Sequence, residues 1–438
     1  MLKHLFLLIT IFFTFNTLAQ DLSFIKVADG FKPIMKLRND TPVVSFVKED
    51  SNDGFIQFGV FNFNTATFNN KILANGNFYG PAYIDNYGSN SALILHNHDL
   101  NGGGAGVFTG NQNWTELDAS DQGHDGWDAS IKAISQNEIY VSYIDAIPFN
   151  GIGVQFSAYD GNAWVIDTVG STALNYGFRT SLEIKSDNSP SILYYNDVTT
   201  DLEVAQKSDN TWNIHKVDTT GDVGYFCDTK MRNDSIFAAY IKRIGTTDAE
   251  LKLSISSNNK DWETVSIGII NNFNFSLMGS KPLSIALSDS IHILSSSQNK
   301  ILHHKISFND FHIVESTVIK TTGTDSTFSQ MANMDIDSKG KLHYCFGVIT
   351  PINSEVIYAT NANITDRPTI RQETFKVYPN PFTNHIKIDG KFETVKVYDL
   401  SGKLLAFNND AIIDLSQLSV GCYNLMIDGF QTLIIKSK

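Results

Sequence analysis

The sequence has little that would cross-link the chain. It has 438 residues but only three cysteines, Cys227, Cys345 and Cys422, which are far apart and odd in number. A secreted scaffold held by disulfides would carry more cysteines at recurrent spacing. Each cysteine lies in an apolar, strand-like stretch, so we expect all three to be buried as small hydrophobic side chains. The fold must therefore be stabilised by packing area.

Charge and long apolar runs are also scarce. Only 18% of the residues are charged, and the net charge is −13. An acidic chain repels phosphate backbones, which disfavours a nucleic-acid partner. Beyond residue 20 no apolar run approaches the ~18 residues that cross a bilayer, so no transmembrane segment is expected in the mature chain. With 42% hydrophobic residues, the composition is that of a folded protein rather than a disordered one.

Residues 1–20 have the three-part pattern of a secretory signal peptide. The basic Lys3 precedes an apolar core from Leu5 to Phe15, and the small Ala19 stands near the end. A membrane anchor or a buried first strand are the alternatives, but the apolar run is short and polar residues interrupt it. We expect export, with a mature chain that begins near Asp21.

The middle of the chain repeats. An aromatic residue recurs every 44 to 50 residues near the start of a stretch that alternates polar and apolar side chains. These anchors are Phe24, Phe68, Trp114, Trp164, Trp212, Trp262 and Phe311. A period of about 40–50 residues with short strands is typical of a β-propeller, in which each repeat is a four-stranded blade. Abundant aromatic residues and scarce proline favour strands, and no stretch forms a convincing amphipathic helix.

The two ends of the repeat complement each other. The first anchor lies in a strand-like stretch at 22–29 with no three strands before it, whereas the last unit, 331–360, has three strands and no fourth. We therefore predict an all-β fold: a seven-bladed β-propeller over residues 21–360, closed by pairing of the N-terminal strand beside 354–360. Closure removes a long unpaired edge. Six or eight blades are the alternatives.

Some hairpins of the repeat resemble those of secreted sialidase-like, or BNR-type, propellers. The stretches 158–164 and 255–262 carry this resemblance. A sialidase Asp box reads Ser-x-Asp-x-Gly-x-x-Trp; Ser256, Asn258 and Trp262 keep part of it and lose the Asp and the Gly. The resemblance is partial and implies a fold rather than an activity.

A polar linker at 361–374 leads into a second, smaller unit at 375–438, whose short alternating strands predict a small β-sandwich. Its motifs are, in order, Tyr378, Pro379, Asn380, Pro381, Gly402, Lys403, Gly421 and Tyr423. This order resembles the type A C-terminal sorting domain of the type IX secretion system; an immunoglobulin-like binding domain is the alternative. The resemblance implies passage through the outer membrane, handling by the secretion machinery and its sortase, and a secreted or surface-attached product.

Binding chemistry in a propeller is expected on the face that carries the loops from second to third strand and the connections between blades, because rigid blades hold these variable loops. Two such loops, 96–104 and 118–128, should be neighbours there. They carry His96, His98, Asp99, Asp121, His124, Asp125, Trp127 and Asp128. One hypothesis is a divalent metal at the His98/His124 pair, or a sugar stacked on Trp127. The other is a solvated rim whose Gly and Asp residues make turns.

Three further residues are candidates for a ligand site. Asp145 and Asp197 begin equivalent loops in the third and fourth blades and could supply the paired carboxylates of a glycosidase facing the channel. Arg179 stands just before an inner strand and could reach the channel. A sialidase needs three arginines on one carboxylate, and the propeller stretch offers Arg38, Arg179, Arg232 and Arg243.

No serine-hydrolase, P-loop or dinucleotide motif occurs in the sequence. The favoured function is therefore a secreted or cell-surface cargo of the type IX system that binds glycan or protein through its loop face without catalysis. The alternatives are an extracellular glycan-degrading hydrolase or lyase, with a sialidase the least favoured, and an adhesin in which the propeller is a rigid spacer. No cofactor is expected beyond the divalent metal of the loop pair.

Overall fold

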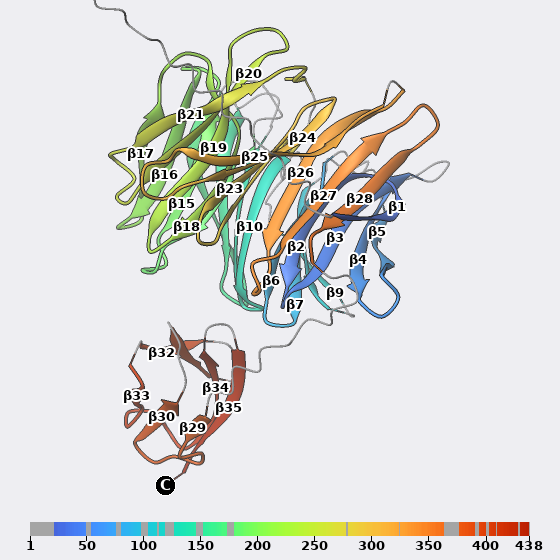
Figure 1. The fold of residues 1–438 in the computed structure, drawn as a ribbon. Helices are drawn as coiled ribbons and strands as arrows, with labels where there is room; N and C mark the ends of the chain where they lie inside the picture. The colour runs from blue at the N-terminus through green and yellow to red at the C-terminus, as the bar shows by residue number, and fades with distance from the viewer. Residues whose placement is uncertain are drawn as a thin grey trace, which may run out of the picture.

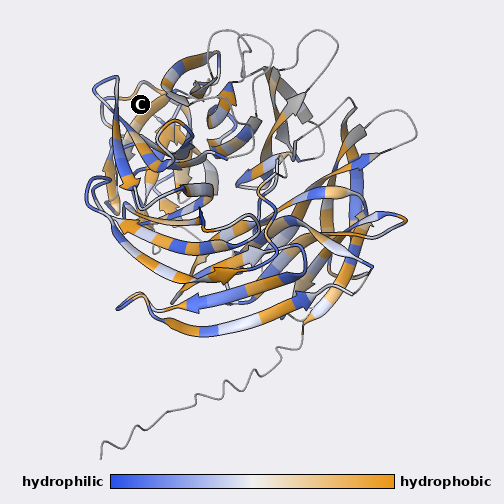
Figure 2. Ribbon diagram, turned by 90° about the horizontal axis from the view of Figure 1, so that it is seen from above, coloured by the Kyte–Doolittle hydropathy of each residue, from blue (hydrophilic) through white to orange (hydrophobic). Residues whose placement is uncertain are grey.

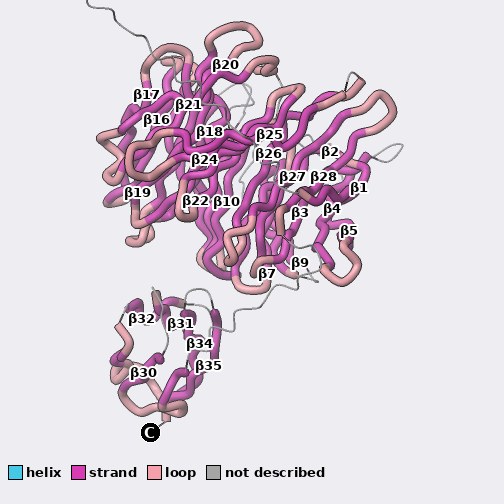
Figure 3. The backbone as a smooth tube through the Cα atoms, in the orientation of Figure 1, coloured by secondary structure: helices cyan, strands magenta, loops and turns pink. Residues whose placement is uncertain are grey.

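The computed structural model describes most of the chain between residues 22 and 437, and every regular element in that part is a β-strand (Figure 1, Figure 3). The described residues are 22–49, 54–75, 80–97, 104–111, 114–118, 127–145, 152–172, 179–276, 279–323, 325–362, 376–389, 394–399, 403–408, 410–427 and 430–437. Within these ranges no helix is long and apolar enough to cross a bilayer. The expected signal peptide at 1–20 lies outside them.

Seven four-stranded antiparallel sheets account for β1 to β28, and six of them use consecutive strands. The first three are β2 (Phe31–Arg38), β3 (Thr41–Glu49), β4 (Gly54–Asn62) and β5 (Thr67–Asn75); β6 (Tyr83–Tyr87), β7 (Asn90–Asn97), β8 (Gly104–Gly110) and β9 (Trp114–Asp118); and β10 (Trp127–Ser135), β11 (Glu138–Asp145), β12 (Ile152–Tyr159) and β13 (Trp164–Thr172).

The next three sheets are β14 (Ser181–Ile184), β15 (Pro190–Asn196), β16 (Asp201–Ser208) and β17 (Thr211–Asp218); β18 (Val223–Arg232), β19 (Ser235–Arg243), β20 (Ala249–Ser256) and β21 (Glu263–Ile270); and β22 (Leu283–Leu287), β23 (Ile291–Ser296), β24 (Lys300–Ile306) and β25 (Ile313–Thr321). The seventh sheet joins the two ends of the repeat: β26 (Thr327–Ile336), β27 (Leu342–Ile349), β28 (Ser354–Thr360) and β1 (Ser23–Asp29).

The closing strand is where the sequence places it. In the antiparallel pairing of β1 with β28, Ser23 lies opposite Thr360 and Asp29 opposite Glu355. The amide of Gly30 extends the pairing by donating to the carbonyl of Ser354 at 2.9 Å. The first strand of each sheet contacts the first strand of the next, and β26 returns to β2, so the sheets form a ring around a central channel.

Side-chain acceptors join the inner strands around this ring. In each case an Asp or Ser oxygen of one sheet accepts the backbone N–H of the next sheet, at 2.9 to 3.1 Å. The pairs are Ser130 with Leu182, Ser181 with Thr229, Asp228 with Ile285, Ser284 with Met334, Asp335 with Leu37, and Asp85 with Ala133. These bonds satisfy inner-strand amides that would otherwise face the channel unpaired.

The core lies between adjacent sheets, because period-2 alternation gives each strand an apolar face (Figure 2). A fully buried tyrosine recurs in the second strand of four sheets, near the strand's end at Tyr143, Tyr194 and Tyr240 and near its start at Tyr344. Of the cysteines, Cys227 and Cys345 are buried as expected, but the prediction is wrong for Cys422, which is exposed. Cys422 lies on the solvent-facing side of β34, whose other side carries the buried Tyr423, Leu425 and Ile427.

The C-terminal unit is built from a three-stranded and a four-stranded sheet. Its strands are β29 (Lys376–Tyr378), β30 (His385–Asp389), β31 (Val395–Tyr398), β32 (Leu404–Asn408), β33 (Ile412–Asp414), β34 (Gly421–Ile427) and β35 (Phe430–Lys436). Phe382, Ile386, Leu425 and Ile434 belong to the buried core between the two sheets. Both amide atoms of Asn380 bond the backbone of β35, at the carbonyl of Leu433 and the N–H of Ile435.

Candidate functional site

Most of the loop pair predicted to hold a metal or a sugar lies outside the described residues. This applies to His98, Asp99, Asp121, His124 and Asp125, and to the side chains of His96 in β7 and Trp127 in β10. In the part that the structure describes, no three His, Cys, Asp or Glu residues are grouped as a metal ion requires. The meeting of the two loops and the metal therefore stay predictions.

Asp128 is the member of this group whose side chain can be placed. It is buried and has a φ of 49°, at a bulge in the inner strand β10. Its backbone carbonyl accepts hydrogen bonds from the N–H and the hydroxyl of Thr180 in the next sheet. Asp128 thus lies at the junction between two sheets.

The other three candidates are in three different places. Arg179 reaches the central channel, as expected, and pairs with Asp228 at 3.1 Å. Asp145 ends β11 and accepts a long hydrogen bond of 3.5 Å from Gln155. Asp197 lines a pocket on the loop face and is absent from the lining of the channel cavity.

This loop-face pocket has a volume of about 560 Å³ and is formed by the fourth, fifth and sixth sheets. The second-to-third-strand loops and the sheet-to-sheet connections supply it, as predicted for a binding face. Its lining is Tyr195, Asp197, Thr200, Asp222, Tyr225, Arg243, Thr246, Thr247, Phe273, Asn274, Phe275, Ser276 and Gln298. Aromatic rings, two carboxylates and one guanidinium therefore share one open hollow.

A carboxylate holds two phenols together in the pocket. Asp222 accepts hydrogen bonds from the Tyr195 hydroxyl at 2.7 Å and from the Tyr225 hydroxyl at 2.9 Å, one on each oxygen. The two rings stack with centroids 4.4 Å apart. Strand alternation places the two neighbouring tyrosines on opposite faces of their sheet, where both are buried: Tyr194 packs toward the third sheet, and Tyr195 packs toward the fifth, beneath the pocket.

The local backbone places Tyr225 beside its partner. Gly224 has a φ of 116°, and a Cβ there would lie 2.9 Å from the Cα of Leu202. Phe226, with a φ of 53°, is part of a bulge between Tyr225 and Asp228. A bulge re-aims side chains at the start of a strand, and here Tyr225 lines the pocket while Asp228 lines the channel.

Arg243 and Phe275 form the second wall of the pocket. The guanidinium carbon lies 5.2 Å from the centre of the Phe275 ring, which is within cation–π range. The Phe275 ring packs edge to face against Tyr225, with ring centroids 5.4 Å apart, and packs at a tilt against Phe273, with centroids 4.8 Å apart. The backbone N–H of Arg243 donates to the carbonyl of Asp222 at 2.8 Å, which ties the two walls together.

The phenols of the pocket are donors rather than bases. Burial, followed by the hydrogen bonds to Tyr225 and Asp222, raises the pKa of Tyr195. Burial also raises the pKa of Tyr225. Both groups are therefore protonated at neutral pH, and their protons are directed at Asp222.

The sequence interpretation found Asp197 but missed Tyr195, Asp222, Tyr225 and Phe275. The double tyrosine at the end of β15 and the Asp immediately before β18 were available signals. These two signals did not predict the pocket, because its residues come from three sheets and no single repeat contains them all.

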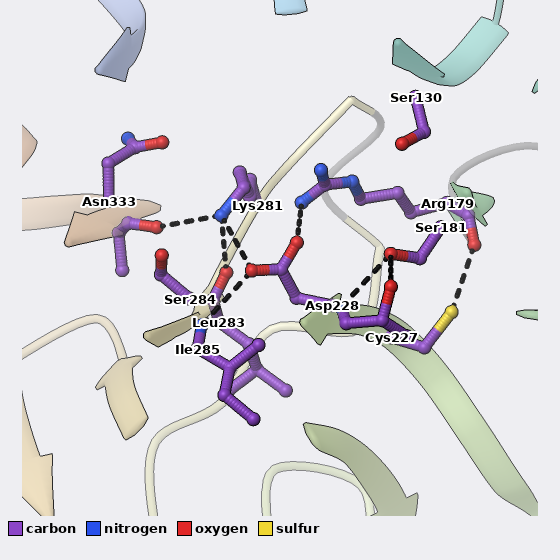
Figure 4. A network of polar contacts seen from close by, with 12 residues as sticks. Ser130, Arg179, Ser181, Cys227, Asp228, Lys281, Leu283, Ser284, Ile285 and Asn333 are labelled. Carbon is purple, nitrogen blue, oxygen red and sulfur yellow. Dashed lines mark hydrogen bonds and ion pairs between the residues drawn. The ribbon is translucent and has the colours of Figure 1, made fainter. Parts of the chain in front are cut away.

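The central channel is filled with charged side chains. A cavity of about 40 Å³ remains in it, lined by residues of all seven inner strands or the residues just before them. Around the channel the inner strands carry cations and anions in alternation. The first five sheets supply Lys36, Asp85, Lys132, Glu183 and Lys230 in that order, and the seventh sheet supplies Asp335. Beside these residues Asp228 pairs with both Arg179 and Lys281 (Figure 4).

The electrostatics of this network follow from burial. Burial alone would raise the pKa of Asp228, but Lys281 and Arg179 outweigh it, so the pKa lies well below its ordinary value. Burial lowers the pKa of Lys281 to about 7, against the attraction of Asp228. The cavity is too small for a sugar, so the channel is not a glycan site.

The four arginines of the propeller are separated. Arg38 lies over Phe58 and bonds Ser91, while Arg232 donates to the carbonyl of Ser288. Arg179 is in the channel and Arg243 in the pocket. The three-arginine clamp of a sialidase is thus not formed by these side chains.

The C-terminal unit matches a known family. Residues 376–437 match the family model described as the secretion system C-terminal sorting domain, which confirms the resemblance to the type IX sorting domain. A protein with this domain is exported to the cell surface or the medium. No curated protein matches the chain.

Solved structures similar to the chain have low sequence identity. The phage phi92 endosialidase aligns with 9% identity and a TM-score of 0.47, over 95% of this chain and 87% of its own. The SapL1 lectin, solved with alpha methyl fucoside, has 10% identity and a TM-score of 0.47, over 68% and 98%. The polysaccharide lyase Uly1 has 10% identity and a TM-score of 0.46, over 76% and 90%. The fold assignment rests on the strand order above.

Proposed function

We propose that this exported protein is a carbohydrate-binding propeller that holds a glycan in the loop-face pocket and does not cleave it. The observation that supports this proposal is the partly exposed Phe275 ring, which lies under Arg243 and packs on the buried Tyr195–Tyr225 pair, in an open hollow of about 560 Å³. Small-ligand sites have volumes of about 300–1,000 Å³ and combine apolar walls with a few oriented polar groups. A sugar needs this combination, because its ring has an apolar C–H face and a rim of hydroxyls.

The polar groups of the pocket suit neutral hydroxyls. Asp197 and Asp222 supply acceptors, and Arg243 and Asn274 supply donors. With two carboxylates against one guanidinium, the pocket disfavours a strongly anionic sugar. We therefore expect a neutral glycan.

The arrangement of Asp222 supports binding over catalysis. Each of its oxygens accepts a phenol hydrogen bond, so this carboxylate braces the aromatic wall. A general base must instead be free to accept the proton of the reacting group. The raised pKa values of the two tyrosines remove the phenols as bases at neutral pH.

The test is glycan binding by the full chain, on a glycan array and then by calorimetry with the best neutral glycan. Phe275→Ala should weaken binding by about 5- to 100-fold, the range for an aromatic anchor at the centre of a site. Tyr225→Phe keeps the ring and removes one bond to Asp222, so it should have a smaller effect. Phe308→Ala is the matched control, because Phe308 also lies under an arginine, Arg232, at 4.9 Å but outside the pocket.

Equal loss with Phe308→Ala and Phe275→Ala, or no saturable binding to any glycan, would contradict the proposal. Such a result would favour the alternative function, an adhesin in which the propeller is only a rigid spacer. Attachment of cells that persists without glycan binding would then identify that role.

A second candidate function is a glycan-degrading enzyme, favoured by the presence of Asp197 and Asp222 in the same pocket. Hydrolysis of glycosidic bonds uses two carboxylates. Release of reducing ends from neutral polysaccharides, abolished by Asp197→Asn with binding retained, would establish it. Saturable binding without turnover would leave the lectin-like function.

A further inference from the structure

The channel cavity has more cations than anions around it. Among its described lining residues, five are cationic and three are carboxylates. The cations are Lys36, Lys132, Arg179, Lys230 and Lys281, and the carboxylates are Asp85, Glu183 and Asp228. Charges in a confined, low-dielectric space need partners close by.

The three carboxylates are already engaged. Glu183 pairs with Lys132 at 2.8 Å and accepts the Thr229 hydroxyl at 3.1 Å. Asp228 is shared by Arg179 and Lys281 (Figure 4). One oxygen of Asp85 accepts the backbone N–H of Ala133 across the sheet junction.

Two lysines are left without such a partner. Among the described residues, no carboxylate oxygen lies within the 4.0 Å ion-pair distance of Lys36 or Lys230. The two ammonium groups, from the first and fifth sheets, lie close enough to each other to interact directly. Both keep some accessible surface, and both line the cavity.

Arg179 provides an independent sign of a missing acceptor. The side chain is buried, with 6% of its surface exposed, and its Nε–H has no acceptor among the described residues. The guanidinium carbon lies 5.0 Å from the centre of the Tyr83 ring. A buried guanidinium donor normally has a hydrogen-bond partner.

We propose that the channel is a binding site for a small monatomic anion, chloride under physiological conditions, held on the cavity side of the adjoining Lys36 and Lys230 ammonium groups with Arg179 as a further donor. A cavity of about 40 Å³ admits an ion of this size and is too small for a carboxylated sugar. The anion screens two like charges that face each other from opposite sheets. It thereby acts as a structural ion that draws the inner strands of the ring together.

The electrostatics of the lysines agree with this site. Burial, and then the charge of Lys230, lower the pKa of Lys36 to about 8. For Lys230, burial is outweighed by the carboxylates of Asp335 and Glu183, which raise its pKa. An anion beside the two would favour the charged form of both. The site is independent of the loop-face pocket and of any glycan.

The direct experiment is a crystal of the full chain grown in sodium bromide, with anomalous data collected at the bromine edge. We expect an anomalous peak in the channel within hydrogen-bonding distance of the Lys36 and Lys230 ammonium groups. A channel that holds only ordered water, or a peak confined to surface lysines, would overturn the proposal. This arm uses the unaltered protein and does not depend on a variant that folds.

A second arm measures thermal unfolding in sodium chloride and in sodium gluconate at equal ionic strength, since gluconate is too large for the cavity. The melting temperature should rise by roughly 2 °C for each tenfold increase in chloride above its dissociation constant, and not with gluconate. Lys36→Met should abolish this difference. Lys339→Met, at an exposed turn, is the control and should keep it. Equal effects of the two salts on the wild type would count against the site.

Discussion

A chain of hydrogen bonds between aromatic rings is buried in the sixth and seventh sheets. Ser288 bonds His292 at 3.0 Å, His292 bonds His303 at 3.0 Å, and His303 bonds the Tyr344 hydroxyl at 3.2 Å. The two histidines each have 5% of their surface exposed. In the His292–His303 contact one ring nitrogen must accept, so at least one of the two imidazoles is neutral, whereas the Ser288 and Tyr344 hydroxyls can either donate or accept.

This chain predicts acid sensitivity at the residue scale. Burial, and then nearby positive charge, lower the pKa of His292 to about 4 and that of His303 to about 3. In the unfolded chain histidine titrates near 6.5, so between these values the unfolded state binds more protons. The contribution of the neutral buried histidines to the free energy of unfolding is therefore fully present above pH ~6.5 and is lost as the pH falls toward 4. We expect a loss on the order of 3 kcal/mol in the free energy of unfolding from His292, measured by urea denaturation at each pH.

The control for this prediction is an exposed histidine. His312 is mostly solvent-exposed and bonds only its neighbour Asp310. The variant His312→Gln should keep the acid dependence, whereas His303→Gln should reduce it without abolishing it, because burial also lowers the pKa of His304 and His343. An unfolding free energy that stays constant from pH 7 to 4 would show that the buried chain does not titrate as argued.

At the scale of elements, closure of the ring depends on the N-terminal strand β1. Without β1, the edge of β28 from Ser354 to Thr360 would be unpaired, and unpaired edges recruit other strands. Deletion of residues 22–29 should therefore open the ring, lower the melting temperature by at least 10 °C and cause self-association, as measured by calorimetry and size-exclusion chromatography.

A restoration experiment distinguishes closure from general damage. A synthetic peptide of residues 22–29 added in excess should raise the melting temperature and restore the monomer, because its register on β28 is fixed by side-chain alternation. A peptide in which Val27 is replaced by Asp should not, since Val27 is buried in the core between the seventh and first sheets. If the deleted chain stays monomeric and equally stable, the ring does not depend on this strand.

Elements were easier to predict than sites, and particular residues show why. The strands at 201–208 and 211–218 have the bounds that their alternation indicates, because alternation is a property of a single strand. The place of Arg179 in the channel followed from its position just before an inner strand, whereas Asp197, expected to face the channel, lines the loop-face pocket instead. The alternation of Lys36, Asp85 and Lys132 around the channel was not predicted, because it appears only when strands about 48 residues apart are compared. The Tyr195–Asp222–Tyr225 group was missed for the same reason.

At the scale of the whole molecule, the two units have separate cores, one between the sheets of the ring and one inside the sorting domain. Few interactions join the described parts of the two units, among them a 3.3 Å hydrogen bond from Tyr398 to Glu138 and a 3.8 Å ion pair from Lys396 to the same carboxylate. These side chains are mostly buried, but both contacts are long and converge on one carboxylate. A small polar interface of this kind does not couple two domains rigidly. The units should therefore unfold independently.

Asn380 allows that independence to be tested together with export. Its amide bonds both the carbonyl of Leu433 and the N–H of Ile435, so Asn380→Ala should cost the sorting domain about 0.5–1.5 kcal/mol by removing two solvent-exposed hydrogen bonds to β35. Calorimetry should show only the smaller transition moving, while glycan binding by the propeller is unchanged. In a host with the secretion machinery, the variant should accumulate inside the outer membrane. Gln417→Ala, at an exposed turn of the same domain, is the control. A single transition that moves as a whole would mean that the propeller and its sorting domain fold as one body.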